Sequence, residues 1–158
     1  MFGVVPKSIW QRTNPADENN QIDLAARCLL VETNDQLILV DTGMGDKQSE
    51  KFFSHYGLWG DYSLEKSILE KGFHPDQITD VLLTHLHFDH VGGAVLRTPK
   101  GQLKPRFKND KYWTSKEHWN WAMNPNLRET ASFLEENLIT LKESWQLCFI
   151  DADTRFPF

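Results

Sequence analysis

Three of the chain's six histidines and one aspartate fall within six consecutive positions, in the sequence HLHFDH. His85 and His87 are two residues apart, so on an extended strand their side chains point to the same side. Asp89 and His90 follow at once, and a loop can fold them over a neighbouring point. Imidazole nitrogen and carboxylate oxygen suit zinc, and also manganese or iron. The spacing therefore predicts a metal site whose two residue pairs could serve two adjacent ions.

The residues on either side of this motif also fit a metal-binding loop. The apolar run DVLLT predicts a buried strand that ends at Thr84, immediately before the first histidine. Gly92 and Gly93 follow the last histidine and would permit close approach of the backbone beside the site. We therefore expect the metal-binding loop to span residues 84–93.

Hydrophobic patterns and turn signals predict the elements that position this loop. Strands are expected at residues 24–33, 36–43, 80–84 and 145–150. Helices are expected at residues 47–57, 63–72, 114–122 and 126–142. Strands and helices alternating in a mixed order predict an α/β layered domain.

Some of these elements carry specific local signals. Asn34-Asp35 predicts a hairpin turn between the first two strands, and the third helix is expected to begin with a capping box at residues 114–117. In the last helix, four leucines are expected to lie in the core: Leu127, Leu134, Leu138 and Leu141. Residues 97–111 are expected to form a basic loop.

Length and composition limit the class of protein. A chain of 158 residues is long enough for a single sizeable core, and its net charge of −5 argues against nucleic acid or an anionic membrane as the main partner. Two cysteines do not make a disulfide framework, and reduced core cysteines fit a cytoplasmic protein. No apolar run approaches the ~20 residues that span a bilayer, and MFGVVPKSIW lacks the pattern of a signal peptide.

The chain resembles the metallo-β-lactamase superfamily, and within it the acyl-homoserine-lactonase-like hydrolases. The segments that carry the resemblance are LILVDTGMGDK, ITDVLLTHLHFDHVGG and YWTSKEHWNWA. The resemblance implies an α/β fold in which residues 1–158 are the N-terminal portion of an αββα sandwich whose second half is missing. It implies that His85 and His87 bind a first metal, and that Asp89 and His90 bind a second. Asp89 would also act in catalysis by interacting with the attacking water.

The same resemblance implies roles for residues outside the motif. Asp41 matches the DTG aspartate that supports the metals, Thr84 would orient the motif, and Phe2 and Val4 would border the substrate pocket. The implied function is a dinuclear zinc hydrolase that opens a lactone or related ester of small-molecule size with a metal-bound hydroxide. Whether the protein forms a homo-oligomer stays open.

The family completes its site with a third histidine, a bridging aspartate and a final histidine, all well downstream of the first motif. The single later histidine here, His118, lies in a predicted helix and is expected not to be a ligand. Asp151 or Asp153 could be proposed as the bridging carboxylate, but both are expected to lie in a loop. His55 and His74 have no partner spacing and are not expected to bind metal.

Two classes of function therefore remain. The first is a hydrolase that is active in the complete protein. The second is an inactive half-domain that binds metal weakly or pairs with another chain. Nucleases, thioesterases, phosphotriesterases and β-lactamases share the first motif. The basic loop 97–111 and the aromatic residues that follow it could form a nucleic-acid patch, but a wall of the substrate pocket or ordinary core packing fits the acidic chain better.

Overall fold

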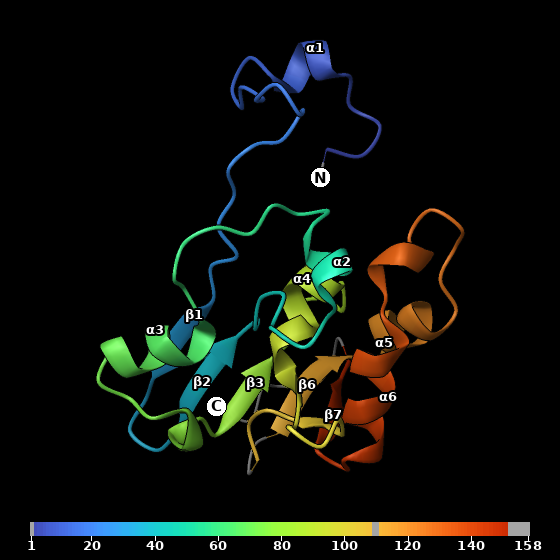
Figure 1. Ribbon diagram of the computed structural model, residues 1–158. Coiled ribbons are helices and arrows are strands. Elements are labelled where there is room, and N and C mark those ends of the chain that lie inside the picture. Colours follow the sequence, from blue (N-terminus) through green and yellow to red (C-terminus); the bar gives the residue numbers. More distant parts are fainter. Residues whose placement is uncertain (1, 109–110, 152–158) are drawn as a thin grey trace.

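The computed structural model describes residues 2–108 and 111–151, and its centre is a five-stranded sheet with helices at its sides (Figure 1). The strands lie in the order β1-β2-β3-β6-β7. Their bounds are Leu29–Glu32 (β1), Leu37–Val40 (β2), Asp80–Leu82 (β3), Lys111–Ser115 (β6) and Leu147–Ile150 (β7). β1 pairs with β2 in antiparallel register, and the other pairings are parallel. The mixed α/β architecture predicted from the sequence is confirmed.

Helices lie beside the sheet. Their bounds are Glu50–Phe53 (α2), Leu64–Glu70 (α3), Phe88–Val91 (α4), Lys116–Met123 (α5) and Glu135–Glu143 (α6), with short 3₁₀ turns at Pro75–Gln77 (η1), Gly92–Ala94 (η2) and Thr130–Ser132 (η3). Figure 1 shows α3 beside β1 and β2, and α5 and α6 beside β6 and β7. Among the residues that the structure describes, no helix has the length and apolar character to cross a membrane.

The core lies on one face of the sheet. Leu39, Val81 and Tyr112 are register partners on β2, β3 and β6, so their side chains form one row across the strands. All three are at most 1% exposed and belong to one apolar cluster that includes Ile68 of α3 and Leu141 of α6. This packing fixes the three central strands relative to the helices and thereby places the ends of the strands, where the candidate site lies.

The hairpin of β1 and β2 was predicted, but other parts of the chain differ from expectation. The predicted loop 97–111 is not open over its described residues 97–108, because β4 (Val95–Arg97) pairs with β5 (Leu103–Pro105) in a second, two-stranded sheet. β6 was not predicted as a strand. It takes up Thr114, so the cap of α5 is Ser115, whose side chain accepts a hydrogen bond from His118 N–H.

Two predicted helices are shorter than expected. Of residues 47–57, only Glu50–Phe53 are helical, and Ser49 caps them. The helix predicted to begin at Asn126 begins at Glu135, and Leu127, predicted to be in the core, is 98% exposed. The Asn126 side chain accepts a hydrogen bond from Arg128 N–H, a local bond that competes with helix formation.

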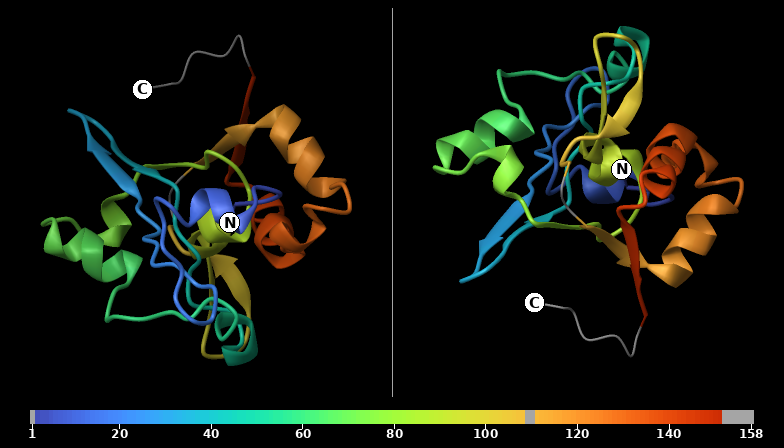
Figure 2. Two further views of the ribbon diagram at one scale, coloured as in Figure 1. Left: turned by 90° about the horizontal axis from the view of Figure 1, so that it is seen from above. Right: turned by 90° about the horizontal axis from the view of Figure 1, so that it is seen from below.

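Residues 2–22 form a segment that we call the N-terminal arm. It contains the single-turn helix α1 (Lys7–Trp10). Figure 1 shows the arm standing away from the sheet, and the left view of Figure 2 shows it over α4. The arm therefore lies at the end of the molecule that carries the histidine motif.

Candidate metal centre

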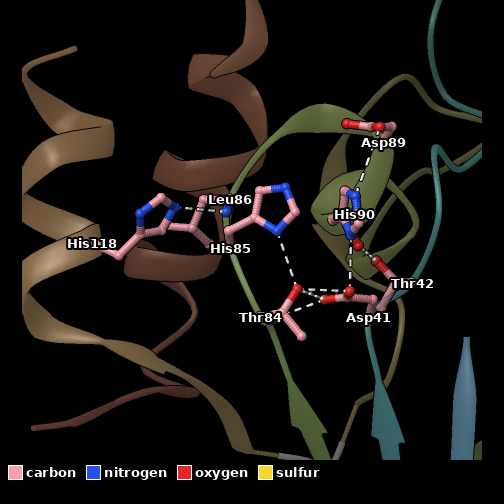
Figure 3. A network of polar contacts seen from close by, with 8 residues as sticks. All are labelled: Asp41, Thr42, Thr84, His85, Leu86, Asp89, His90 and His118. Carbon is pink, nitrogen blue, oxygen red and sulfur yellow. Dashed lines mark hydrogen bonds and ion pairs between the residues drawn. The ribbon is translucent and has the colours of Figure 1, made fainter. Parts of the chain in front are cut away.

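The histidine motif begins where β3 ends, next to the end of β2. Because β2 and β3 are parallel, the residues that follow them leave the sheet at the same edge. Asp41 N–H donates to the carbonyl of Leu82 at 2.9 Å, which extends this pairing by one step. The topology thus brings Asp41, forty-three positions upstream, beside Thr84 and the motif (Figure 3).

Asp41 is the centre of the polar network in Figure 3. Its backbone has φ of 59°, a left-handed conformation that aspartate tolerates better than most residues. Its carboxylate accepts hydrogen bonds from Thr84 N–H at 2.9 Å, from the Thr84 hydroxyl at 2.8 Å and from His90 Nδ1 at 2.8 Å. One carboxylate therefore holds both the start and the end of the motif.

These bonds assign the protons of two imidazoles. A carboxylate only accepts, so His90 Nδ1 carries a proton, and in the neutral ring Nε2 then presents the lone pair. The single hydroxyl proton of Thr84 goes to Asp41, so the Thr84 oxygen accepts from His85 Nδ1, 3.1 Å away. His85 Nε2 also keeps its lone pair. Both rings are thus oriented with one nitrogen ready to bind a metal.

The four residues of the motif lie close together. Ring centroids are 4.7 Å apart for His85 and His87 and 3.9 Å apart for His85 and His90. An oxygen of Asp89 lies 3.7 Å from His90 Nε2. Burial, and then the neighbouring His90 and His87, lower the pKa of His85, which favours the neutral form that binds metals.

The donor types and proton positions fit zinc or a similar divalent ion, but the set is partial. Within residues 2–108 and 111–151, no three histidine, cysteine or carboxylate groups are arranged to hold one ion. Asp151 lies exposed after β7, and Asp153 lies outside the described residues. The residues described here supply four candidate ligands, and further ligands would be needed to complete a closed site.

The backbone of the motif packs directly on the loop that follows β2. A Cβ atom on Gly92 would lie 2.1 Å from the carbonyl oxygen of Met44, and one on Gly93 would lie 2.1 Å from that of Thr42. Thr42 N–H and hydroxyl both donate to the carbonyl of His90 at 2.8 Å. The close approach predicted for the two glycines is confirmed, and it leaves no room for a side chain.

Two cations bind the carbonyls of these glycines, and neither contact was predicted from the sequence. Lys47 Nζ donates to the carbonyl of Gly92 at 2.6 Å, and Arg106 Nε donates to that of Gly93 at 2.8 Å. Arg106 also pairs with Asp46 and Glu65. Lys47 is 6% exposed, and this burial lowers its pKa to about 8. The metal-binding loop is therefore held at its glycine pair by Lys47 and Arg106, as well as by Asp41.

Two aromatic side chains outside the motif lie against it. His118 Nε2 accepts a hydrogen bond from Leu86 N–H at 2.9 Å, so this nitrogen is already engaged. The ring of Phe133 lies 4.8 Å from that of His87. The remaining histidines do not join the site: His74 caps η1, and His55 is exposed in the turn after α2.

The residues expected to border the substrate pocket lie in the N-terminal arm. Phe2 stacks on Trp10 with ring centroids 4.8 Å apart, and Val4 is 85% exposed. A small hollow of about 210 Å³ is lined by Phe2, Trp10 and neighbouring residues of the same arm. Their role toward a substrate stays a prediction.

Comparisons with known proteins agree with this geometry. A model of the Metallo-beta-lactamase superfamily matches residues 22–133. An N-acyl homoserine lactonase from Bacillus sp is 30% identical over 122 residues, which cover 67% of this chain and 46% of that relative. The solved structure of a probable metal-dependent hydrolase from Staphylococcus aureus has a TM-score of 0.81 at 29% identity, covering 96% of this chain and 53% of that one.

A dizinc quorum-quenching lactonase, AidC, solved in complex with the product N-hexnoyl-L-homoserine, has a TM-score of 0.59 at 28% identity. That match covers 82% of this chain and 44% of AidC. The chain thus spans about half the length of the proteins it matches. Because the family model covers both the DTG loop and the histidine motif, the chain belongs to the metallo-beta-lactamase superfamily, as a lactonase-like member.

Proposed function

We propose that this chain carries the metal-binding part of a metal-dependent hydrolase that opens a lactone or a related small-molecule ester. The observation that carries the proposal is the network of Asp41, which engages Nδ1 of His90 directly and Nδ1 of His85 through Thr84, so that Nε2 is the nitrogen each neutral ring would offer to a metal. Metal ligands in proteins are oriented by such outer partners. The named activity of the N-acyl homoserine lactonase from Bacillus sp and of AidC supports the choice of a lactone.

In this proposal residues 1–158 form one incomplete domain, and residues 84–93 are its metal-binding loop. His85 and His87 would hold one ion, and Asp89 and His90 a second. Zinc is the metal that fits these donors best, and manganese or iron would also fit. When bound, the metal lowers the pKa of water and polarises a carbonyl group.

The chain's own residues have separate tasks. Asp89 is about one-third exposed at the side chain, so its carboxylate can accept a proton from an attacking water. Asp41 and Thr84 would keep the imidazoles in the tautomers that bind metal. An acidic chain with this site favours a small neutral substrate over nucleic acid.

The first test compares zinc content and lactone opening in the full-length protein and in Asp41→Asn. Asparagine keeps the size of the side chain and tolerates the left-handed backbone, but it removes the charge that fixes the two imidazoles. We expect a roughly tenfold to hundredfold loss of zinc affinity. Asp23→Asn, at an exposed position, is the control with the same change in net charge.

Zinc content is measured by elemental analysis, and lactone opening by acid release from N-hexanoyl-homoserine lactone with and without a chelator. Activity that a chelator does not change would exclude the metal-dependent mechanism. Zinc binding without opening of any lactone or ester would exclude the proposed substrate class while keeping the metal site.

A second function, an inactive half-domain that pairs with another chain, is favoured by one observation. The two outer strands carry exposed apolar side chains, Leu29 on β1 at 60% and Phe149 on β7 at 37%. Exposed strand edges are sites of association. Light scattering on the active protein decides between the two, because a monomeric and active 158-residue chain would rule out the pairing.

A further inference from the structure

The peptide group between the first two expected ligands is held from outside the loop. Leu86 stands between His85 and His87, after β3 has ended at Leu82 and before α4 begins at Phe88. Its N–H has no strand or helix partner there, and it donates to His118 Nε2 at 2.9 Å (Figure 3). The Leu86 side chain is fully buried in the core. Both the backbone N–H and the side chain of Leu86 are therefore held in place.

His118 is itself held in place to accept this bond. It lies in the first turn of α5, where its own N–H donates to the capping side chain of Ser115 at 3.2 Å. α5 follows β6, the strand that pairs with β3, so the register of the sheet sets where His118 stands relative to Leu86. Its ring lies 5.8 Å from that of Phe133 and 6.4 Å from that of Trp121.

The direction of the bond fixes the state of the His118 ring. Leu86 N–H donates, so Nε2 must present a lone pair, and the ring proton of a neutral imidazole then resides on Nδ1. Burial lowers the pKa of His118, which agrees with a neutral ring. With Nε2 occupied by the Leu86 N–H, His118 differs from His85, whose Nδ1 faces the Thr84 hydroxyl.

We propose that His118 is a positioning residue of the metal centre, whose Nε2 fixes the Leu86 N–H and thereby the directions of the flanking His85 and His87 side chains. This inference rests on the proposed metal function. The Leu86 N–H lies in the peptide plane that joins His85 to Leu86, so a turn of this plane changes ψ of His85 and φ of Leu86 and shifts the backbone that carries the two flanking histidines. His118 therefore acts on the metal through the backbone and does not touch it.

Two variants of the full-length protein separate this role from simple packing. His118→Gln keeps a hydrogen-bond acceptor at about the same reach, whereas His118→Phe keeps an aromatic ring and removes the acceptor. Three quantities are measured: zinc affinity by competition with a chromogenic chelator, hydrogen exchange of the Leu86 amide in the metal-free protein, and the unfolding midpoint of the metal-free protein.

We expect His118→Phe to bind zinc roughly tenfold more weakly or worse, the size usual for loss of an outer partner, and to exchange the Leu86 amide faster. We expect His118→Gln to stay within about threefold of the wild type in zinc affinity. The two variants should have similar unfolding midpoints. A merely structural role would instead change stability and zinc affinity together.

Wild-type zinc affinity in His118→Phe would overturn the inference while leaving the proposed function intact. Equal weakening in both variants, in proportion to their loss of stability, would also overturn it, because the ring would then matter only for packing. If the wild-type protein binds no zinc, the proposed function itself fails, and the positioning role fails with it.

Discussion

The metal-binding loop and the N-terminal arm are fixed in opposite ways. The loop, residues 84–93, is bonded to segments far away in the chain, through Asp41, Lys47, Arg106 and His118. Among the described residues, the hydrogen bonds of residues 2–21 stay within the arm. Asp17, for example, accepts from the N–H groups of Asn19 and Gln21, both at 2.8 Å.

This difference indicates how the two parts of a substrate site are built. The positions of the expected metal ligands follow from the sheet, because parallel strands, buried glycines and buried cations hold the loop. The arm keeps its own shape through local bonds and the stacking of Phe2 on Trp10, but it exposes Val4 at 85% and Ile9 at 57%. Changes in the loop should therefore affect stability and metal together, whereas changes in the arm should affect only the substrate.

The largest effect is expected for Gly92→Ala. Gly92 has φ of −56°, so alanine meets no backbone strain, but its Cβ would stand 2.1 Å from the Met44 carbonyl oxygen. The nearest atoms all belong to the backbone of Met44 and cannot rotate away. We expect a loss of about 3 kcal/mol in the free energy of unfolding, at the upper end for overpacking, together with loss of bound zinc. Chemical unfolding and elemental analysis measure the two effects.

Gly72→Ala is the matched control for this clash. Gly72 has φ of 87° and open space around it, so alanine there suffers only backbone strain, about 1–2 kcal/mol. It should keep its zinc. Equal losses of stability and zinc in the two variants would show that close backbone packing does not set the loop.

A smaller, pH-dependent effect is expected at Lys47. Burial lowers its pKa from 10.5 to about 8. Below pH 8 the lysine is charged in both folded and unfolded states, and the folded protein bears the full cost of burying the charge. Between pH 8 and 10.5 the unfolded state binds more protons, so stability rises with pH. Relative to Lys47→Met, the wild type should therefore gain roughly 1–3 kcal/mol across this window.

Chemical unfolding of both proteins at a series of pH values measures this difference. Cys28, whose pKa burial raises to about 11, acts in the opposite direction, but it is present in both proteins and cancels in the comparison. A difference in stability that does not change between pH 8 and 10.5 would mean that Lys47 keeps an ordinary pKa beside Gly92.

Much of the site could be predicted because its signals are local. The spacing of HLHFDH, the apolar run before it and the glycine pair after it all lie within residues 80–93. The two-residue turn at Asn34-Asp35 predicts β1 and β2, and parallel pairing of β2 with β3 then places Asp41 beside Thr84. The resemblance to the superfamily added the roles, which spacing alone does not give.

The supports of the loop could not be predicted, because each depends on the pairing of distant segments. His118 reaches Leu86 only because β6 pairs with β3, and β6 was itself missed. Lys47 and Arg106 look like ordinary surface cations in the sequence until the glycine carbonyls are placed beside them. Leu127 shows the reverse error: helical spacing predicted a core position, but the bonds of Asn126 keep this segment out of the helix.

The smallest effect on the fold is expected for Phe2→Ala, which tests the arm alone. Phe2 stacks on Trp10 within the arm, so its loss should change the free energy of unfolding of the protein by less than about 0.5 kcal/mol. Zinc content should stay the same. If Phe2 borders the substrate pocket, the KM for a lactone should rise severalfold with little change in kcat, because uniform binding is lost. Val5→Ala, at a neighbouring exposed position, is the control. An unchanged KM would remove Phe2 from the pocket, whereas a loss of zinc would mean that the arm and the metal-binding loop are coupled after all.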